Sequence, residues 1–222
     1  MDTLLECVEL QTRDQPDASV IWLHGLGADG YDFIPIVKEL QALGAPAARY
    51  VFPHAPMRPV TINGGYVMRA WYDILGTQID RQEDREGIVQ SQAQILALIE
   101  REKARGISSS RIVLAGFSQG GAIALQTGLR IDQPLAAMVI LSSYLPLASS
   151  VPAQSTPTGR SIPVFMGHGR QDTMILLTRA QASRDALAAL GVKVQWHEYV
   201  MAHSVDQDEL ADIARFLSEA LK

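Results

Sequence analysis

The pattern Gly-x-Ser-x-Gly at residues 116–120 places a serine where it could act as a nucleophile. It follows the apolar run 112–115 and precedes a segment of helical spacing that begins near Gln119, so it occupies a strand–turn–helix. A serine on so sharp a turn leaves no room for side chains two residues away, which explains the two glycines. The helix N-terminus then lies beneath Ser118 and directs the Gln119 backbone N–H at a developing oxyanion. The alternative is a glycine-rich turn with a solvated serine.

A serine nucleophile needs an imidazole to take its proton, and the imidazole needs a carboxylate to fix its tautomer. Of the five histidines, only His203 lies just beyond a predicted strand and before the last predicted helix, at the sheet edge where open α/β folds carry their chemistry. Asp172 follows the predicted strand 163–167 at the same edge. The order Ser118, Asp172, His203 is that of α/β-hydrolases. Taken singly, Asp172 could instead be a turn or N-cap carboxylate, and His203 a surface histidine.

Residues 25–30 match Gly-x-Gly-x-x-Gly after the predicted strand 20–24, a pattern shared with dinucleotide-binding loops. Such a loop needs an acidic residue about 20 positions further on for the ribose hydroxyls, and residues 50–54 are Tyr-Val-Phe-Pro-His. We therefore favour a loop that supplies a second oxyanion donor, the Leu26 backbone N–H, over a nucleotide site or a plain turn. No zinc-ligand spacing and no phosphate-binding loop with a following lysine occurs, so no metal or organic cofactor is predicted.

Short apolar runs alternate with longer segments of helical spacing along nearly the whole chain. This alternation predicts an α/β fold, a mostly parallel sheet with helices on both faces and a small cap domain or none. The predicted strands are 4–11, 20–24, 49–53, 111–117, 135–141, 163–167 and 192–199. The predicted helices are 32–43, 86–105, 119–130, 177–190 and 207–221. Two stretches, 53–81 and 144–162, lack clear periodicity and are predicted to be long loops.

Composition sets the broad class of the protein. At roughly 150 residues per domain, 222 residues predict a single domain over 1–222, and 47% hydrophobic content is enough for a large core. The formal charge of −5 disfavours a nucleic-acid partner. The single Cys7 fits a reducing compartment, and neither a signal peptide nor an 18-residue apolar run is present. These features predict a cytoplasmic protein without stable membrane insertion.

The motifs taken together resemble the phospholipase/carboxylesterase family, the small α/β-hydrolases that include carboxylesterases and acyl-protein thioesterases. The resemblance rests on Trp-Leu-His-Gly-Leu-Gly at 22–27, Ala-Pro at 55–56, Asn-Gly-Gly at 63–65, Trp-Tyr-Asp at 71–73, Gly-Phe-Ser-Gln-Gly-Gly at 116–121, His168-Gly169 with Asp172, and the segment 199–204. It covers almost the whole chain. It implies that Ser118 is the nucleophile, Asp172 the acid and His203 the base. It also implies that the backbone N–H groups of Leu26 and Gln119 are the oxyanion donors.

The resemblance also concerns the substrate groove. The stretch 56–74 resembles a region that helps to wall the acyl groove of bacterial esterases, which implies substrate contacts for Trp71, Tyr72 and Ile74. Packing in a satellite core is the alternative for the two aromatic residues. Two departures from the family pattern bear on substrate preference. Residues 173–176 are Thr-Met-Ile-Leu instead of a hydrophobic pair ending in proline, and Ala202 replaces a glycine.

From these residues we predict a serine hydrolase that cleaves carboxylic esters of short to medium acyl chain through an acyl-enzyme on Ser118. An acyl-protein thioesterase or a lysophospholipase is the alternative that keeps this chemistry. The alternative without this chemistry is a hydrolase fold that binds a ligand and does not catalyse a reaction. The expected partner is a small ester or acyl-thioester substrate, and the tendency of small esterases to pair admits a homodimer.

Overall fold

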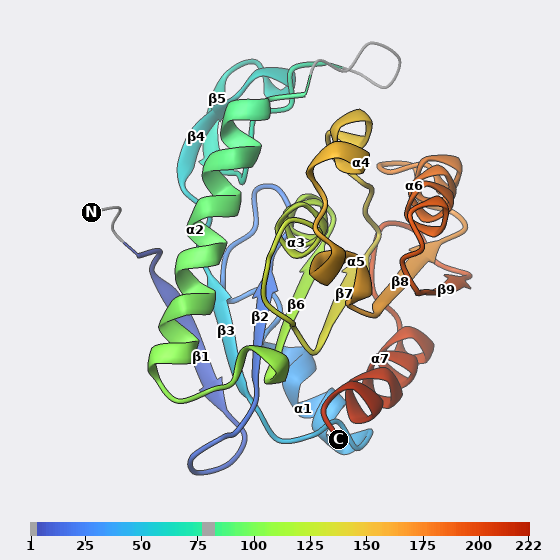
Figure 1. Ribbon diagram of the computed structural model, residues 1–222. Coiled ribbons are helices and arrows are strands. Elements are labelled where there is room, and N and C mark those ends of the chain that lie inside the picture. Colours follow the sequence, from blue (N-terminus) through green and yellow to red (C-terminus); the bar gives the residue numbers. More distant parts are fainter. Residues whose placement is uncertain (1–3, 77–82) are drawn as a thin grey trace.

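The computed structural model describes residues 4–76 and 83–222 and is built on a seven-stranded sheet (Figure 1). Its strand order is β1-β3-β2-β6-β7-β8-β9, with β1 antiparallel to β3 and every other neighbouring pair parallel. The strands are β1 (Cys7–Gln11), β2 (Ser19–Leu23), β3 (Arg49–Pro53), β6 (Ile112–Phe117), β7 (Ala137–Leu141), β8 (Val164–Gly169) and β9 (Val194–Tyr199). Each overlaps one predicted strand, and the predicted mostly parallel sheet is confirmed.

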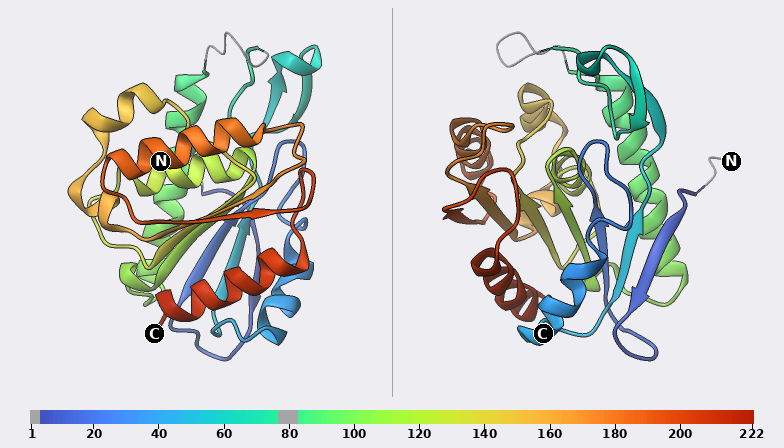
Figure 2. Two further views of the ribbon diagram at one scale, coloured as in Figure 1. Left: turned by 90° about the vertical axis from the view of Figure 1, so that its right-hand side faces the viewer. Right: turned by 180° about the vertical axis from the view of Figure 1, so that it is seen from behind.

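Helices cover both faces of this sheet (Figure 2). Helices α1 and α7 lie on one face, and α2, α3 and α6 lie on the other. Because alternate side chains of a strand point to opposite faces, Ile21 of β2 packs with the second group and Trp22 with the first. Within the described ranges, no helix is long and apolar enough to cross a membrane. The helices that cover the sheet are α1 (Ile34–Ala42), α2 (Arg85–Ala104), α3 (Gln119–Gly128), α6 (Leu177–Ala189) and α7 (Gln207–Ala220).

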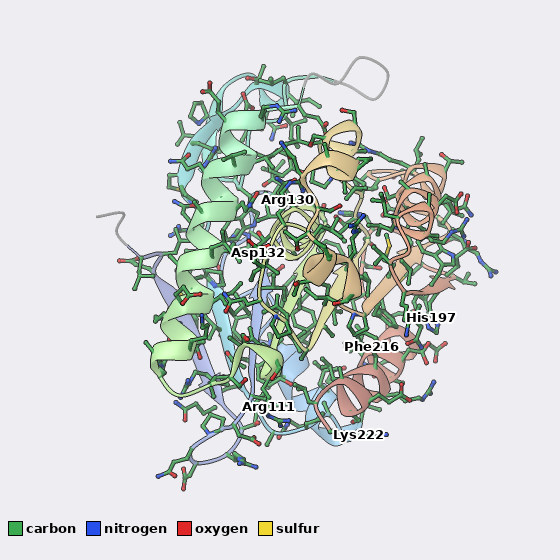
Figure 3. The ribbon with its side chains drawn as sticks, viewed as in Figure 1. Arg111, Arg130, Asp132, His197, Phe216 and Lys222 are labelled. Atoms are coloured by element: carbon green, nitrogen blue, oxygen red, sulfur yellow. The ribbon has the colours of Figure 1, made fainter. Side chains whose placement is uncertain are left out.

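Helix α7 packs against the β8–β9 edge through aromatic rings (Figure 3). Phe216 of α7 contacts Phe165 of β8 with 5.6 Å between ring centroids, and His197 of β9 stacks on the same ring at 5.0 Å. The helix begins after Asp206, whose side chain accepts the backbone N–H of Glu209. The cap therefore fixes where the loop from β9 ends and α7 begins, and the contact of Phe216 fixes the helix against β8.

The two stretches without periodicity contain short elements that were not predicted. The first forms a two-stranded antiparallel hairpin of β4 (Met57–Val60) and β5 (Tyr66–Arg69), joined by the 3₁₀ turn η1 (Thr61–Asn63). Strand β4 reads Met-Arg-Pro-Val, and a proline within a four-residue run removes the usual strand signal. Residues 77–81 of this stretch lie outside the described part of the chain. The second stretch contains η3 (Ala148–Ser150), α4 (Val151–Gln154) and α5 (Pro157–Ser161).

Candidate active site

Ser118 occupies a strained turn between β6 and α3. Its φ of 54° and ψ of −119° lie in a region that non-glycine residues avoid. The Ser118 N–H donates to the Leu141 carbonyl at 2.9 Å. The Ser118 carbonyl accepts the Ser143 hydroxyl at 2.6 Å and the Ala122 N–H at 3.2 Å. Hydrogen bonds from β7, the segment after it and α3 therefore hold the serine in a conformation that it would not adopt on its own.

The glycines on either side of Ser118 leave no room for a side chain. A Cβ on Gly116 would lie 2.5 Å from the Gly120 carbonyl oxygen. A Cβ on Gly120 would lie 2.6 Å from the His24 carbonyl oxygen, and closer still to that of Leu23. Both obstacles are backbone atoms, which cannot rotate aside, so the steric reason predicted for the glycine spacing is confirmed. The close approach at Gly120 also places the end of β2 against the first turn of α3.

Asp172 and His203 meet at the carboxyl ends of β8 and β9. His203 Nδ1 lies 2.6 Å from Asp172 Oδ2, while Asp172 Oδ1 accepts the backbone N–H groups of Met174 and Ile175 at 2.8 Å each. With Nδ1–H donated to the carboxylate, Nε2 is the acceptor nitrogen of the neutral ring. The His203 ring also lies 4.7 Å, centroid to centroid, from that of Phe117, the residue before the serine. The structure thus brings the predicted acid and base together beside the predicted nucleophile.

His168 supports the acid, and the sequence did not indicate this role. Its Nε2–H donates to the Ile175 carbonyl at 2.8 Å and lies 3.5 Å from Asp172 Oδ2. Burial lowers the pKa of His168, so the ring is neutral and acts as a hydrogen-bond donor rather than as a charge. The ring therefore holds the Ile175 end of the loop 172–175 and lies next to the carboxylate at its other end. The available signal was the His-Gly pair at the end of β8, four residues before Asp172.

The loop after β2 runs alongside Ser118. A Cβ on Gly25 would lie 3.3 Å from the Phe117 ring and 3.6 Å from Ser118 Cβ, so the loop lies in contact with the turn that carries the serine. Leu26 follows, and Gln119 begins α3 on the other side of the serine. In residues 4–76 and 83–222, neither the Leu26 N–H nor the Gln119 N–H donates to a protein acceptor. Both predicted oxyanion donors are therefore available to a substrate oxygen.

His24 holds this loop from inside the protein. Its Nδ1–H donates to the Gly25 carbonyl at 2.7 Å, and its Nε2 accepts the Ala55 N–H at 3.1 Å. Burial lowers the pKa of His24 to about 4, so the imidazole is neutral at physiological pH, as this pair of bonds requires. His24 is thus a fixed part of the scaffold, joining the end of β2 to the segment after β3.

The three residues predicted to contact substrate lie in or near the interior. Trp71 is fully buried and donates its indole N–H to the His24 carbonyl at 2.9 Å. Tyr72 is buried and shares a 2.6 Å hydrogen bond with the Tyr144 hydroxyl. Ile74 is half-buried. The burial of Trp71 and Tyr72 agrees with the packing alternative, and substrate contact by any of the three stays a prediction.

A pocket of about 550 Å³ opens next to the Asp172 loop. It lies between the loops after β7 and β8 and helix α6. Ile175, one of its lining residues, donates its N–H to Asp172, and Leu145 lies two residues beyond Ser143, which binds the Ser118 carbonyl. The pocket therefore borders the loop that holds the predicted acid. Its lining residues are Glu83, Leu145, Ala148, Met174, Ile175, Leu176, Thr178, Arg179, Ala182, Ser183 and Ala186.

Comparison with known proteins gives one consistent result. The profile described as phospholipase/carboxylesterase matches residues 6–221. Acyl-protein thioesterase 1 of Yarrowia lipolytica is 35% identical over 220 residues, which cover 97% of each chain. Among solved structures, Arabidopsis thaliana SOBER1 superposes with a TM-score of 0.85 at 30% identity, covering 92% of this chain and 99% of that one. Zea mays acyl-protein thioesterase 2 superposes with a TM-score of 0.87 at 28% identity, covering 98% and 99%.

Proposed function

The chain belongs to the phospholipase/carboxylesterase family of α/β-hydrolases and is a serine hydrolase of esters or thioesters, and from this premise we propose that Ser118, His203 and Asp172 carry its reaction. The observation that carries the proposal is the 2.6 Å hydrogen bond between Asp172 and His203. It lies at the carboxyl ends of the strands, where Ser118 is held in its strained turn after β6. Those features are what nucleophilic acyl transfer needs.

The proposed reaction has two halves. His203 Nε2 takes the Ser118 Oγ proton as the oxygen attacks the acyl carbon, and the backbone N–H groups of Leu26 and Gln119 hold the resulting oxyanion. The imidazolium, stabilised by Asp172, then gives its proton to the leaving alcohol or thiol, and the acyl group remains on Ser118. In the second half His203 takes a proton from water as the hydroxide attacks the acyl-enzyme. The imidazolium then returns this proton to Ser118 Oγ as the bond to the acyl carbon breaks and the carboxylic acid leaves.

The pocket beside Asp172 is the proposed acyl site. Leu145, Ile175 and Leu176 give it an apolar surface, whereas Glu83 and Arg179 add charge to its lining. The charged groups of this lining would lie against a long apolar chain, which favours short to medium acyl chains. We therefore propose carboxylic esters with such chains as substrates. A cytoplasmic location and a homodimeric state remain predictions from the sequence.

A second candidate is thioester hydrolysis on acylated proteins. It is favoured by the curated relatives, which are named acyl-protein thioesterases and are 34–35% identical to this chain over nearly its whole length. The two candidates share the same catalytic groups and differ in leaving group and acyl length. The chemistry of the site is thus common to both.

The test is hydrolysis of p-nitrophenyl acetate, butyrate, octanoate and palmitate, and of a peptide S-acylated on cysteine with the same chains. Ser118→Ala is measured beside the wild type. We expect turnover of the butyrate or octanoate ester by the wild type and none above the buffer blank by the variant. Wild-type activity in Ser118→Ala would overturn the proposed triad. A preference for the long-chain S-acyl peptide over every ester would favour the second candidate.

A further inference from the structure

The side chain of Gln119 has no part in the proposed reaction, yet it is buried and hydrogen-bonded at both of its polar ends. It is 3% exposed. Its Oε1 accepts the Trp71 backbone N–H at 2.8 Å, and its Nε2 donates to the Tyr72 carbonyl at 2.7 Å. The two backbone groups belong to adjacent residues in the segment after β5. A single amide therefore joins the first residue of α3 to a segment 47 residues away in sequence.

Trp71 carries this connection further, to the other oxyanion donor. Its indole N–H donates to the His24 carbonyl at 2.9 Å, and its ring lies 5.3 Å from that of His24, centroid to centroid. His24 in turn binds the Gly25 carbonyl, one residue before Leu26. The Ser91 hydroxyl of α2 also donates to the Trp71 carbonyl and anchors the segment from behind. A continuous set of hydrogen bonds thus runs from Gln119 to the loop of Leu26.

We propose that the Gln119 side chain is a positioning residue that sets the spacing of the two oxyanion donors. It fixes its own backbone N–H by tethering the first turn of α3, and it fixes the Leu26 N–H through Trp71 and His24. This inference rests on the proposed function, since it takes those two N–H groups as the oxyanion donors. An oxyanion hole works when both donors lie within about 3 Å of the developing charge, so their mutual spacing is critical.

The amide of Gln119 pairs two buried backbone groups as well as its own polar ends. An apolar side chain would leave the Trp71 N–H and the Tyr72 carbonyl unpaired, so a control must separate this structural cost from an effect on the oxyanion donors. The helix offers a direct comparison in Gln126, which is 1% exposed and donates through Nε2 to Gln92 at 2.8 Å. That bond leads away from Ser118. Gln126 is therefore a control of the same type, burial and helix, with one side-chain hydrogen bond where Gln119 has two, since among the described residues its Oε1 has no partner.

The main test compares Gln119→Met with Gln126→Met on p-nitrophenyl butyrate. We expect kcat of Gln119→Met to fall about 100-fold with KM within about threefold, because mispositioned donors weaken binding of the transition state more than that of the substrate. Gln126→Met should keep kcat within about threefold of wild type at a temperature where both variants are folded. Equal kcat values in the two variants would overturn the inference.

A transition-state analogue separates positioning from a general structural effect. The ketone 1,1,1-trifluorodecan-2-one adds to a serine and places its oxyanion in the same hole. We expect its inhibition constant to rise in Gln119→Met by about the same factor as kcat/KM on p-nitrophenyl butyrate falls. An unchanged inhibition constant beside a reduced kcat/KM would overturn the proposal, because oxyanion binding would then be intact.

Two further variants keep the proposal testable if Gln119→Met is poorly folded. In Gln119→Glu only the protonated carboxyl can accept from Trp71 and donate to Tyr72, so the ratio of its kcat to that of wild type should rise as the pH falls. A ratio independent of pH would count against the proposal. Trp71→Phe removes the indole N–H, and its reduction of kcat should not multiply with that of Gln119→Glu in the double variant. Fully multiplicative losses would contradict the shared connection.

Ser118→Ala distinguishes the failure of this inference from that of the proposed function. If Ser118→Ala is inactive and Gln119→Met behaves like Gln126→Met, the triad stands and only the positioning role falls. If Ser118→Ala retains wild-type activity, the proposed function fails and the positioning role falls with it.

Discussion

The Asp172 carboxylate holds the His203 imidazole through a 2.6 Å hydrogen bond although 31 residues separate the two in the chain. The side chain of Asp172 is fully buried, whereas that of His203 keeps 19% of its surface exposed. The acid is thus enclosed by its own loop, and the base lies at the boundary between that loop and solvent. This arrangement suits the proposed roles, in which His203 exchanges protons with a substrate while Asp172 fixes its orientation.

Replacing the acid by its amide should leave the fold intact and stop catalysis. In Asp172→Asn the Oδ1 can still accept from Met174 and Ile175, but an NH₂ group would face His203 Nδ1 and force the opposite tautomer. His203 Nε2 would then carry a proton and could not take that of Ser118. We expect kcat on p-nitrophenyl butyrate to fall about 10³–10⁴-fold, with a melting temperature within a few degrees of wild type. A loss below tenfold would exclude Asp172 as the acid.

Alanine should be far more damaging at Gly120 than at a glycine in open space. A Cβ on Gly120 would meet the backbone carbonyls of Leu23 in β2 and of His24 just after it. A Cβ on Gly44 would meet no atom within 4 Å, so the cost there comes only from the strain of a side chain at a φ of 88°. We expect Gly44→Ala to lower the free energy of unfolding by about 1 kcal/mol and Gly120→Ala by about 3 kcal/mol or more. Urea unfolding measures both values. Equal costs would contradict the close packing of α3 on β2.

The pocket can be tested by filling it from helix α6. Ala182 is exposed and lines the pocket, while Ala188 is exposed on the same helix and is not among the lining residues. We expect Ala182→Trp to shift the optimal acyl length on p-nitrophenyl esters towards acetate, because the indole would occupy space for the chain. Ala188→Trp should leave the optimum unchanged. An unaltered profile in Ala182→Trp would place the acyl chain elsewhere.

A buried acid on α7 should make stability depend on pH. Glu209 is fully buried against Gly167, and among the described residues neither of its carboxyl oxygens has a hydrogen-bond partner. Burial, together with the neighbouring Asp206 and Asp212, raises the pKa of Glu209 to about 9. In the unfolded chain the carboxyl ionises near its ordinary pKa of 4.5, so stability is lost as the pH rises between these two values.

Glu209→Gln removes this dependence because the amide stays neutral. We expect its gain in free energy of unfolding over wild type to grow from pH 5 to pH 8 at roughly 1.4 kcal/mol per pH unit. Glu102 is the matched control, equally buried but paired with Arg49, Arg101 and Arg105. Glu102→Gln should lower the free energy of unfolding at both pH values. A constant difference between Glu209→Gln and wild type would show that the carboxyl ionises freely in the folded protein.

Much of the site could be predicted from the sequence because its parts are local. The strand–turn–helix around Ser118 follows from an apolar run, two glycines and a helical period within a few residues. The positions of Asp172 and His203 just after strands follow from the same periodicity, and parallel strands place such residues at one edge. The reading of the loop 25–30 as an oxyanion loop depended on a missing acidic residue, which is again visible in the chain.

What the sequence alone determined, therefore, is the order of the elements and the candidate nucleophile, acid and base. The tertiary structure decided how these parts are held: Trp71 inside the protein instead of in an open groove wall, His168 across the loop of Asp172, and Gln119 tied to the segment after β5. The physical reason is that short-range sterics and hydrophobic periodicity act between near neighbours. The partner of a buried polar group depends instead on which distant segments packing brings within hydrogen-bond distance.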